Sequence, residues 1–331
     1  MKLQILIPQY REDESVILPL LKSIELQQSV DLQNDVGVII ANDGSDVLLS
    51  DEFLSQFPFQ IQYLKCPHQG VSAARNACLD AATADYVMFC DADDLFFNLC
   101  AFYILFREMD NGGFDSLFSV FVEESRDPVS CAPVFINHEM DSTFVHGKVH
   151  RRQYLLDHHI RWNPALTVHE DSYFNTLCQK IADPSRVKYC PTPFYLWKWR
   201  DASVCRHDPK YILKTYPSML ESSAALVREF LSRGRAKDAQ MIAVGMIFDS
   251  YFTMNKKDWI DQENLSYRLS TEERFAKYYL EFRRLFDTAP EAEKLQIVSC
   301  IRQRMYMEGL LMESITFDQW IERVLAQYNE L

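Results

Sequence analysis

The stretch Tyr86-Val87-Met88-Phe89-Cys90-Asp91-Ala92-Asp93-Asp94 decides the fold class, because an apolar run ends abruptly in three carboxylates. Apolar runs of this length, bounded by polar residues, are typical of buried strands. While the chain stays extended, Asp91 and Asp93 point to the same side. Two hard oxygen ligands on one face suit Mg²⁺ or Mn²⁺. The alternative is that Asp93 or Asp94 caps a helix starting near Leu95, which explains one acid but not three.

The residues before this strand alternate between strand and helix patterns. Apolar runs at 3–7, 36–41 and 59–64 predict strands, whereas 12–28 and 70–82 predict helices. This alternation predicts an α/β fold with right-handed crossovers and a mostly parallel sheet flanked by helices. Such sheets bind ligands beyond the carboxyl ends of their strands. The polar residues expected at that edge are Gln9, Tyr10, Asp43, Asp91 and Asp93.

The second half of the chain begins as a mixture of helices and strands and ends in helices. Helices are predicted at 95–109, 151–157 and 170–181, a hairpin at 114–123 and 133–138, and edge strands at 187–189 and 194–199. After about residue 208 the pattern is amphipathic, and helices are predicted at 219–231, 236–254, 270–286, 291–311 and 317–325. We therefore predict an α/β domain over 1–210 and an α-helical C-terminal region over 211–331.

Composition narrows the class of protein. The 331 residues carry a net charge of −13, which disfavours general binding to a phosphate backbone. Nothing in the chain matches the G-x-G-x-x-G or P-loop pattern. The nine cysteines form no C-x-x-C pair, which favours a reducing compartment over a disulfide framework. Since no signal-peptide or bilayer-spanning stretch is seen, we expect a cytoplasmic protein, either free or peripheral to a membrane.

Four motifs, taken in order, resemble the signature of family 2 glycosyltransferases, which are inverting enzymes with the GT-A fold. They are Ile5-Leu6-Ile7-Pro8-Gln9-Tyr10, Val38-Ile39-Ile40-Ala41-Asn42-Asp43-Gly44-Ser45, Gly70-Val71-Ser72-Ala73-Ala74-Arg75-Asn76 and Asp91-Ala92-Asp93-Asp94. Each motif is weak alone, but each stands at a strand end or a helix start and the order is specific. The resemblance, which covers roughly the first two hundred residues, implies that 1–210 is a nucleotide-sugar-binding catalytic domain.

The resemblance also implies a donor site at the strand ends. Asp43 would accept the imide N–H of uracil, which makes UDP the first expectation, with TDP and GDP behind. Asp93 would hold Mn²⁺ or Mg²⁺. The family's usual Asn is Arg11 here, and a lone arginine such as Arg75 is more commonly a surface helix residue. The donor-nucleotide residues implied in this half are Pro8, Tyr10, Glu12, Asp43, Gln69, Gly70, Arg75 and Asp91.

Glu170 and Asp171 resemble the family's acid pair at a helix start. An inverting transfer needs a base that takes the acceptor proton as the hydroxyl oxygen attacks the anomeric carbon. We predict Asp171 as this base and Glu170 as the second candidate. A helix N-terminus lowers the pKa of a carboxylate, so such a base would act late, when the hydroxyl has become acidic. Compensation of the helix dipole is the alternative explanation for one acid.

The segment 195–207 resembles the family element after the last strands of the sheet. By this resemblance Arg200 or Arg206 could neutralise the departing phosphates. His207 could be a further metal ligand, although a lone histidine is about as often polar surface. Lys148 follows another element that resembles the family near the donor, and it could meet a phosphate or be solvated.

Two other functions stay open at the level of the sequence. A nucleotidyltransferase also joins an α/β sheet to an acidic metal site, but Pro8-Gln9-Tyr10-Arg11-Glu12 replaces its usual Gly-rich basic loop. A degenerate glycosyltransferase could be a binding module, although the retained acids argue against it. The acceptor is open between a glycan, a lipid-linked saccharide, a protein, a small molecule and a modified nucleobase. The C-terminal helices could cover the acceptor site, form a homo-oligomer or dock a partner.

Overall fold

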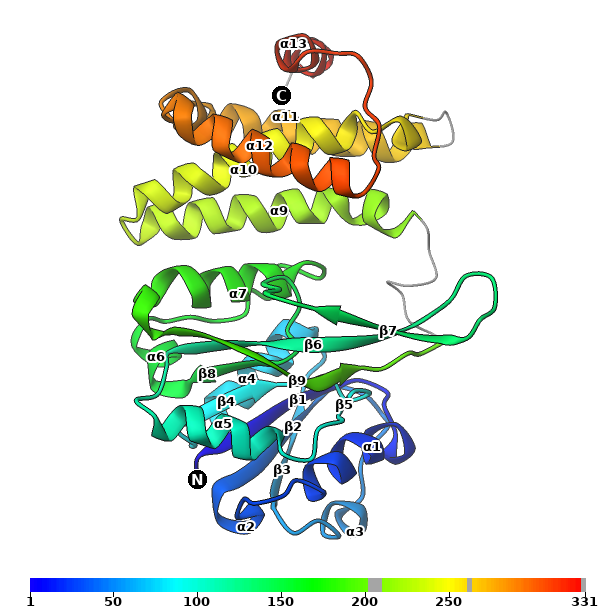
Figure 1. Ribbon diagram of the computed structural model, residues 1–331, viewed down its shortest axis with the longest axis vertical. Coiled ribbons are helices and arrows are strands. Elements are labelled where there is room, and N and C mark those ends of the chain that lie inside the picture. Colours follow the sequence, from blue (N-terminus) through cyan, green and yellow to red (C-terminus); the bar gives the residue numbers. More distant parts are fainter. Residues whose placement is uncertain (202–209, 261–263, 329–331) are drawn as a thin grey trace. The chain divides into compact units, whose positions relative to one another are not determined.

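The computed structural model describes residues 1–201, 210–260 and 264–328, and the chain divides into two compact units (Figure 1). Unit 1 comprises Met1–Ser203 and unit 2 comprises Val204–Leu331. The division falls within 202–209, which the structure does not describe, so the domain boundary near residue 210 stays a prediction.

Unit 1 is built on one sheet, in which the nine described strands have the order β3-β2-β1-β4-β8-β6-β9-β5, with β7 paired to β6. The strands are β1 (Leu3–Gln9), β2 (Val36–Asp43), β3 (Gln60–Cys66), β4 (Tyr86–Phe89), β5 (Leu95–Phe96), β6 (Ser116–Arg126), β7 (Pro133–His138), β8 (Lys148–Arg151) and β9 (Val187–Trp197). The helices are α1 (Glu14–Glu25), α2 (Leu32–Asp35), α3 (Asp51–Leu54), α4 (Val71–Ala81), α5 (Ala101–Asp110), α6 (Arg152–Asp157) and α7 (Glu170–Ile181), with the 3-10 helix η1 (Pro184–Arg186).

The first half of the sheet is parallel, as the strand-helix alternation predicts. β1 pairs in parallel with β2 and β4, and β2 pairs in parallel with β3. The side chains of β1, β2 and β4 are almost all buried, which explains their continuous apolar runs. The register sets Gln9 beside Asn42 and Leu6 beside Phe89, so the carboxyl ends of these strands meet at one edge of the sheet.

The second half of the sheet is mixed. β8 pairs antiparallel with β4 and β6, β7 forms the predicted hairpin with β6, and β9 runs parallel to β6. The two edge strands predicted at 187–189 and 194–199 are wrong: they are one strand, β9, which lies between β6 and β5. The helix predicted at 95–109 is also wrong at its start, because Leu95–Phe96 pairs with β9 and α5 begins at Ala101.

Unit 2 is helical within its described residues. It contains α9 (Tyr211–Ser232), α10 (Ala236–Met254), α11 (Leu265–Asp287), α12 (Glu291–Met307) and α13 (Phe317–Gln327), with the 3-10 helix η2 (Lys257–Trp259). α9, α10 and α11 pack on one another, α12 packs on α10, and α13 packs on α11. Within the described parts of the chain, no helix is long and apolar enough to span a membrane. The predicted fold class, an α/β domain with a helical C-terminal region, is confirmed.

Candidate active site

A cavity of about 400 Å³ lies at the carboxyl ends of β1, β2 and β4. The parallel registers explain its place, because they bring the polar residues that follow these strands to one edge. The roles predicted for the lining residues stay predictions, but the structure does gather them. The predicted residues that line this cavity, called here the donor cavity, are Pro8, Tyr10, Glu12, Asp43, Gly70, Arg75, Asp91, Asp93 and Glu170.

Arg75 joins the acid residues of the donor cavity. It lies on α4, is 3% exposed, and donates to Asp91 at 3.0 Å. The same guanidinium donates to Glu170 at 3.2 Å and Asp171 at 2.8 Å, and its carbon lies 4.3 Å from the ring centroid of Trp162. Burial disfavours the charged form of Arg75 and acts to lower its pKa. The three acids favour the charged form more strongly, so the pKa of Arg75 is raised. Arg75 is therefore a buried hub and not a surface helix residue.

Asp171 is the second residue of α7, and 19% of its side chain is exposed. One carboxylate oxygen accepts from Arg75, and the other accepts from the backbone N–H of Val145 at 3.0 Å. Burial raises the pKa of Asp171 to about 7, although Arg75 acts in the opposite direction. The sequence-based expectation of a lowered pKa is wrong, because burial outweighs the influences that favour the carboxylate, which are Arg75 and the Val145 N–H. A carboxyl group that titrates near neutral pH suits general base catalysis.

Trp162 connects the two helices that carry these residues, and sequence reasoning missed it. Its ring stacks on Phe174 of α7, with centroids 4.2 Å apart. The side chain of Asn76 on α4 donates to the Trp162 carbonyl at 2.9 Å and accepts from its N–H at 3.0 Å. The only signal in the sequence is Asn76, which ends the motif quoted above. These contacts fix α4 against α7 and so hold Arg75 near Asp171.

Asp43 shapes the loop that leads into α4. It is buried, and its carboxylate accepts from the backbone N–H groups of Gln69 at 2.8 Å and Gly70 at 2.9 Å. The Nδ1 atom of His68 lies 2.9 Å from the same carboxylate, and its ring stacks on Tyr10 with centroids 4.7 Å apart. His68 also lines the donor cavity and was missed, although it directly precedes the Gln69-Gly70 pair. A nucleobase that binds to Asp43 would therefore contact a carboxylate that already accepts hydrogen bonds from this loop.

The chain does not stay extended after β4, so the expected extended backbone is wrong, although Asp91 and Asp93 both line the donor cavity. Residues 91–94 form a turn in which the Asp94 N–H donates to the Asp91 carbonyl at 3.3 Å. The Asp91 N–H donates to the Tyr195 hydroxyl at 3.2 Å, and that hydroxyl donates to Asp94 at 2.7 Å. Asp94 thus ties the turn to β9. The helix-capping alternative is wrong, because Leu95 begins a strand.

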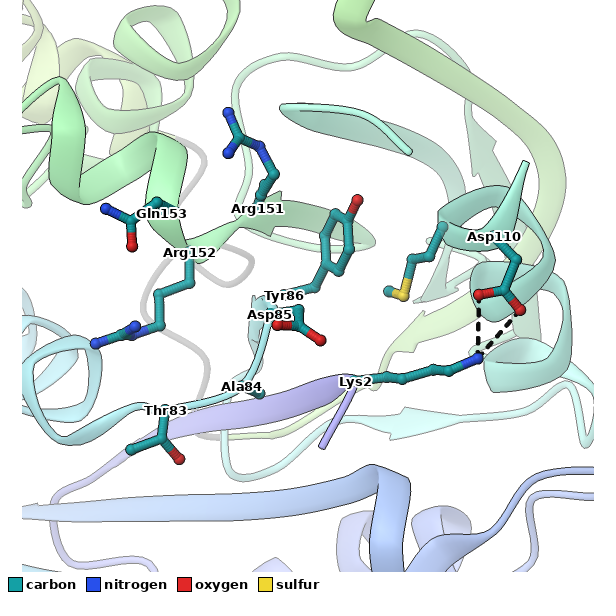
Figure 2. A pocket seen from close by; sticks show the side chains of 10 residues that line it. Lys2, Thr83, Ala84, Asp85, Tyr86, Asp110, Arg151, Arg152 and Gln153 are labelled. Atoms are coloured by element: carbon teal, nitrogen blue, oxygen red, sulfur yellow. Dashed lines mark hydrogen bonds and ion pairs between the residues drawn. The ribbon is translucent and has the colours of Figure 1, made fainter. Parts of the chain in front are cut away.

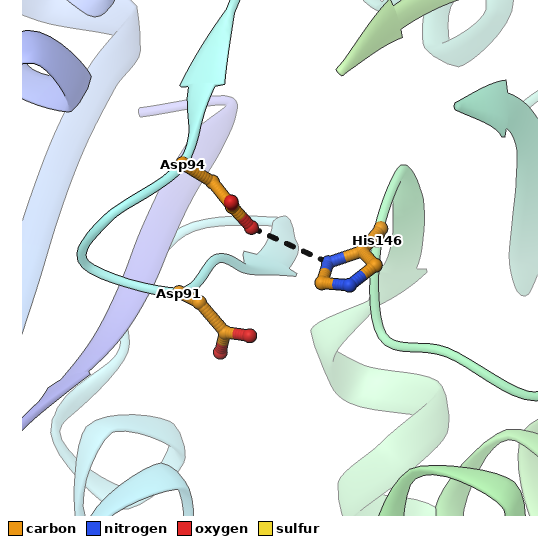
Figure 3. A group of neighbouring side chains, drawn as sticks. All are labelled: Asp91, Asp94 and His146. Atoms are coloured by element: carbon orange, nitrogen blue, oxygen red, sulfur yellow. Dashed lines mark ion pairs between the residues drawn. The ribbon is translucent and has the colours of Figure 1, made fainter. Parts of the chain in front are cut away.

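Asp91, Asp94 and His146 present one ligand atom each within 4.8 Å of one another (Figure 3). The Nδ1 atom of His146 lies 3.5 Å from Asp94, which is only 1% exposed and also accepts from the Lys198 N–H at 2.9 Å. Burial and the two neighbouring aspartates raise the pKa of Asp94 well above its usual range. The two oxygens of Asp94 accept from the Tyr195 hydroxyl and from the Lys198 N–H, so we assign Asp94 to the structure of the turn.

Asp93 differs from Asp94, because 26% of its side chain is exposed and it lines the donor cavity. Arg200, which follows β9, places Nη1 2.9 Å from Asp93 and 3.6 Å from Glu12. Glu12 accepts from the backbone N–H of Tyr10 at 2.6 Å. Two cavity-lining carboxylates therefore share one guanidinium. Asp93 and Asp91 both line the cavity and supply the hard oxygen ligands that Mg²⁺ and Mn²⁺ prefer, so the residues present fit such an ion.

Lys148 does not line the donor cavity. Lys148 is buried in β8, where its ammonium group lies 3.2 Å from Asp141, and burial lowers the pKa of Lys148. The solvated alternative for Lys148 is wrong, because β8 carries the side chain into the sheet, whereas a phosphate contact stays a prediction. Arg206 and His207 lie outside the described residues.

A second cavity, of about 410 Å³, lies near the opposite ends of β1 and β4 (Figure 2). Three of its charged residues are paired within the protein: Lys2 lies 3.1 Å from Asp110, and Arg151 lies 2.8 Å from Asp115. Among the residues that the structure describes, no predicted site residue lines it. We therefore assign the candidate active site to the donor cavity.

Comparison with known families identifies the domain that contains this cavity. Residues 4–163 match the model of glycosyl transferase family 2. The matched region contains the strands β1, β2 and β4 and the four quoted motifs. The resemblance is thus confirmed: residues 4–163 are a glycosyl transferase family 2 domain.

Individual proteins are similar to this chain over different lengths. It is 49% identical to the succinoglycan biosynthesis protein ExoM of Rhizobium meliloti (strain 1021) over 39 residues, which are 12% of this chain and 13% of ExoM. It is 28% identical to the minor teichoic acid biosynthesis protein GgaB of Bacillus subtilis (strain 168) over 139 residues, which are 38% of this chain and 14% of GgaB. Only a small part of either relative is therefore matched.

The fold is also similar to solved structures. The crystal structure of S. aureus TarS 1-349 in complex with UDP-GlcNAc has a TM-score of 0.60 and 16% identity, over 95% of this chain and 97% of that chain. A crystal structure of S. aureus TarS, with a TM-score of 0.59 and 17% identity, matches over 88% of this chain and 50% of that chain. At this level of identity the similarity shows a shared fold.

Proposed function

We propose that this protein is a metal-dependent glycosyltransferase that moves a sugar from a UDP-sugar to an acceptor hydroxyl with inversion. The observation that carries the proposal is the donor cavity, where Arg75 of the family 2 domain pairs with Asp91 and also with Glu170 and Asp171, which follow the matched residues. A donor side and an acid-base side thus lie in one ion-paired network. The similarity to a TarS complex with UDP-GlcNAc supports UDP and makes UDP-GlcNAc the first donor to test.

On the donor side, we propose that the uracil stacks on Tyr10 and donates its imide N–H to Asp43. Tyr10 is exposed enough to receive a base, and both residues line the donor cavity. The two N–H groups that Asp43 already accepts hold its carboxylate in one orientation. A carboxylate has about four acceptor positions, so a further N–H can be accommodated.

We propose that Asp93, with Asp91 beside it, holds Mn²⁺ or Mg²⁺. Such an ion supplies electrostatic stabilisation of the charge that develops on the departing nucleoside diphosphate. The guanidinium of Arg200 is paired with Asp93. From this position it could also donate to the phosphates of the nucleoside diphosphate.

On the acceptor side, we propose that Asp171 takes the proton of the attacking hydroxyl. Arg75 and the Val145 N–H fix its two oxygens, so the carboxylate needs no reorganisation before the proton is transferred. The hydroxyl oxygen forms a bond to the anomeric carbon as the bond to the diphosphate breaks, which inverts that centre. Glu170, which lines the cavity and also contacts Arg75, is the second candidate.

We propose that the acceptor is a hydroxyl of a surface polysaccharide or of its precursor. The two curated relatives are named for the biosynthesis of succinoglycan and of minor teichoic acid, which supports this class over a protein or a nucleobase. The sugar and the polymer are not specified by the residues of the donor cavity.

A thermal-shift panel of UDP, GDP, TDP and CMP, each with and without Mn²⁺, tests the donor proposal. Ligand at 100 times its Kd stabilises the native state by about 2.7 kcal/mol, which is a measurable rise in Tm. We expect UDP to give the largest rise in Tm. This rise should require Mn²⁺ and should be absent in Asp93→Asn. No shift from any nucleotide would favour the degenerate-module alternative.

The stereochemistry of transfer tests the mechanism independently. The anomeric configuration of the product, followed by NMR from UDP-GlcNAc and a polysaccharide acceptor, should be opposite to that of the donor. A product with retained configuration would rule out the single displacement by Asp171.

A further inference from the structure

We infer that Arg200 is an internal cation for Asp93 in the nucleotide-free protein, so that a divalent ion binds well only together with the nucleotide diphosphate. This inference rests on the proposed function and adds the order in which the ligands of that site bind.

The geometry places one guanidinium between two cavity-lining acids. Nη1 of Arg200 lies 2.9 Å from Oδ2 of Asp93 and 3.6 Å from Oε1 of Glu12. Because both oxygens lie near the same nitrogen, the two carboxylates also lie near each other. The two acids therefore repel each other and need a cation between them. Arg200 supplies that cation where the proposed metal ligand stands.

The other acids of the donor cavity are compensated in a different way. Arg75 pairs with Asp91, Glu170 and Asp171, and it is 3% exposed, so it is fixed within the fold. Arg200 is 38% exposed and comes from the segment that follows β9. Of these two arginines, Arg200 is the one that a ligand can displace without opening the protein core.

A divalent ion that arrives alone meets the charge of Arg200 at Asp93. It has to displace the guanidinium or lie beside it, and two like charges this close repel strongly. A nucleotide diphosphate changes this balance, because its oxygens can accept from Arg200 while they also coordinate the ion. Ion and nucleotide should therefore strengthen each other's binding by the same factor.

Mn²⁺ binding without nucleotide, measured by EPR of the free ion, tests this inference directly. We expect Arg200→Gln to bind Mn²⁺ at least about tenfold more tightly than the natural protein, because the competing charge is gone. Arg200→Lys, which keeps a positive charge, should show a smaller gain. The factor by which UDP strengthens Mn²⁺ binding should shrink in Arg200→Gln.

Arg186→Gln is the matched control. Arg186 is 39% exposed, and its Nε lies 2.9 Å from Asp115, so the ion pair resembles that of Arg200 but lies away from the donor cavity. Its Mn²⁺ affinity should equal that of the natural protein. Thermal melts with Mn²⁺ alone give a second readout, and the rise in Tm should be larger for Arg200→Gln than for the natural protein.

The outcomes separate this inference from the proposed function. If the natural protein binds Mn²⁺ with UDP but Arg200→Gln binds Mn²⁺ alone no more tightly, Arg200 is not a competing cation and only the inference is overturned. If the natural protein binds neither UDP nor Mn²⁺ with UDP, both are overturned.

Discussion

At the scale of the residue, Asp171 is under two opposing influences. Burial favours its protonated form, the guanidinium of Arg75 favours the carboxylate, and burial prevails, so its pKa is raised to about 7. A base works only when it is deprotonated. The turnover of UDP-sugar should therefore fall about tenfold per pH unit below pH 7 and level off above it. A rate profile from pH 5 to pH 9 checks this, and a rate unchanged down to pH 5 would contradict it.

Replacing Asp171 separates chemistry from donor binding. Asp171→Asn should lower kcat by about 10²–10⁴-fold, because the side chain can no longer take a proton. The affinity for UDP should stay unchanged, since Asp171 is not among the residues that line the donor cavity. Steady-state kinetics and UDP titration measure the two effects. Glu170→Gln is the comparison, and a larger loss of kcat in that variant would exchange the roles of the two acids.

Arg75 should matter to stability as well as to activity. Arg75→Met leaves Asp91, Glu170 and Asp171 without their shared cation, and breaking a buried pair in this way costs about 3–5 kcal/mol. Urea denaturation measures the loss in the free energy of unfolding. Arg186→Gln breaks a more exposed pair and should cost at most about 1 kcal/mol. Equal losses in both variants would show that Arg75 is not the hub described above.

At the scale of the element, the turn after β2 depends on one glycine. Gly44 has φ of +70°, and a Cβ atom there would lie 2.4 Å from the backbone nitrogen of His68. We expect Gly44→Ala to destabilise the protein by about 1–3 kcal/mol and to weaken UDP binding, because the loop that Asp43 holds must move.

Gly112→Ala is the control for that prediction. Gly112 also has a positive φ, of +87°, but a Cβ there meets no atom within 4 Å. Gly112→Ala should lower the free energy of unfolding by about 1–2 kcal/mol, because only the left-handed conformation is unfavourable for alanine there. UDP binding should be unchanged. Calorimetric melts and UDP titrations of both variants provide the measurement. Weakened UDP binding in Gly112→Ala would show that the effect of Gly44→Ala is not local.

Elements with a clear local period were predictable, and those defined by distant partners were not. The helix at 170–181 has the bounds expected from its sequence pattern. The short strand Leu95–Phe96 exists because it pairs with β9, about a hundred residues later, so the local pattern continued into a false helix. β9 was split in two and placed at an edge for the same reason. The periodicity of apolar residues indicates which face of an element is buried. It does not indicate which strand a given strand will pair with.

At the scale of the whole molecule, the predictable part of the site is the part that the strand order of the sheet brings together. The ends of β1, β2 and β4 must meet in a parallel sheet, so Asp43 and Asp91 were expected near each other. The ion pair of Arg75 with Asp171 joins residues 96 positions apart, and the stacking of Trp162 on α7 sets it. Such packing leaves no trace in residue spacing. The same is true of Lys148, which β8 carries into the sheet.

The division into two units makes a last prediction about the isolated N-terminal half. All the described residues that line the donor cavity belong to Met1–Ser203, and so does a continuous apolar core that includes Leu3, Ile40, Met88 and Phe121. A unit with its own core can fold by itself, and the described lining of the donor cavity comes from this unit. Residues 1–203 alone should therefore melt cooperatively and bind UDP with Mn²⁺ as tightly as the full chain does. A folded fragment with no affinity for UDP would show that 204–331 contributes to the donor site.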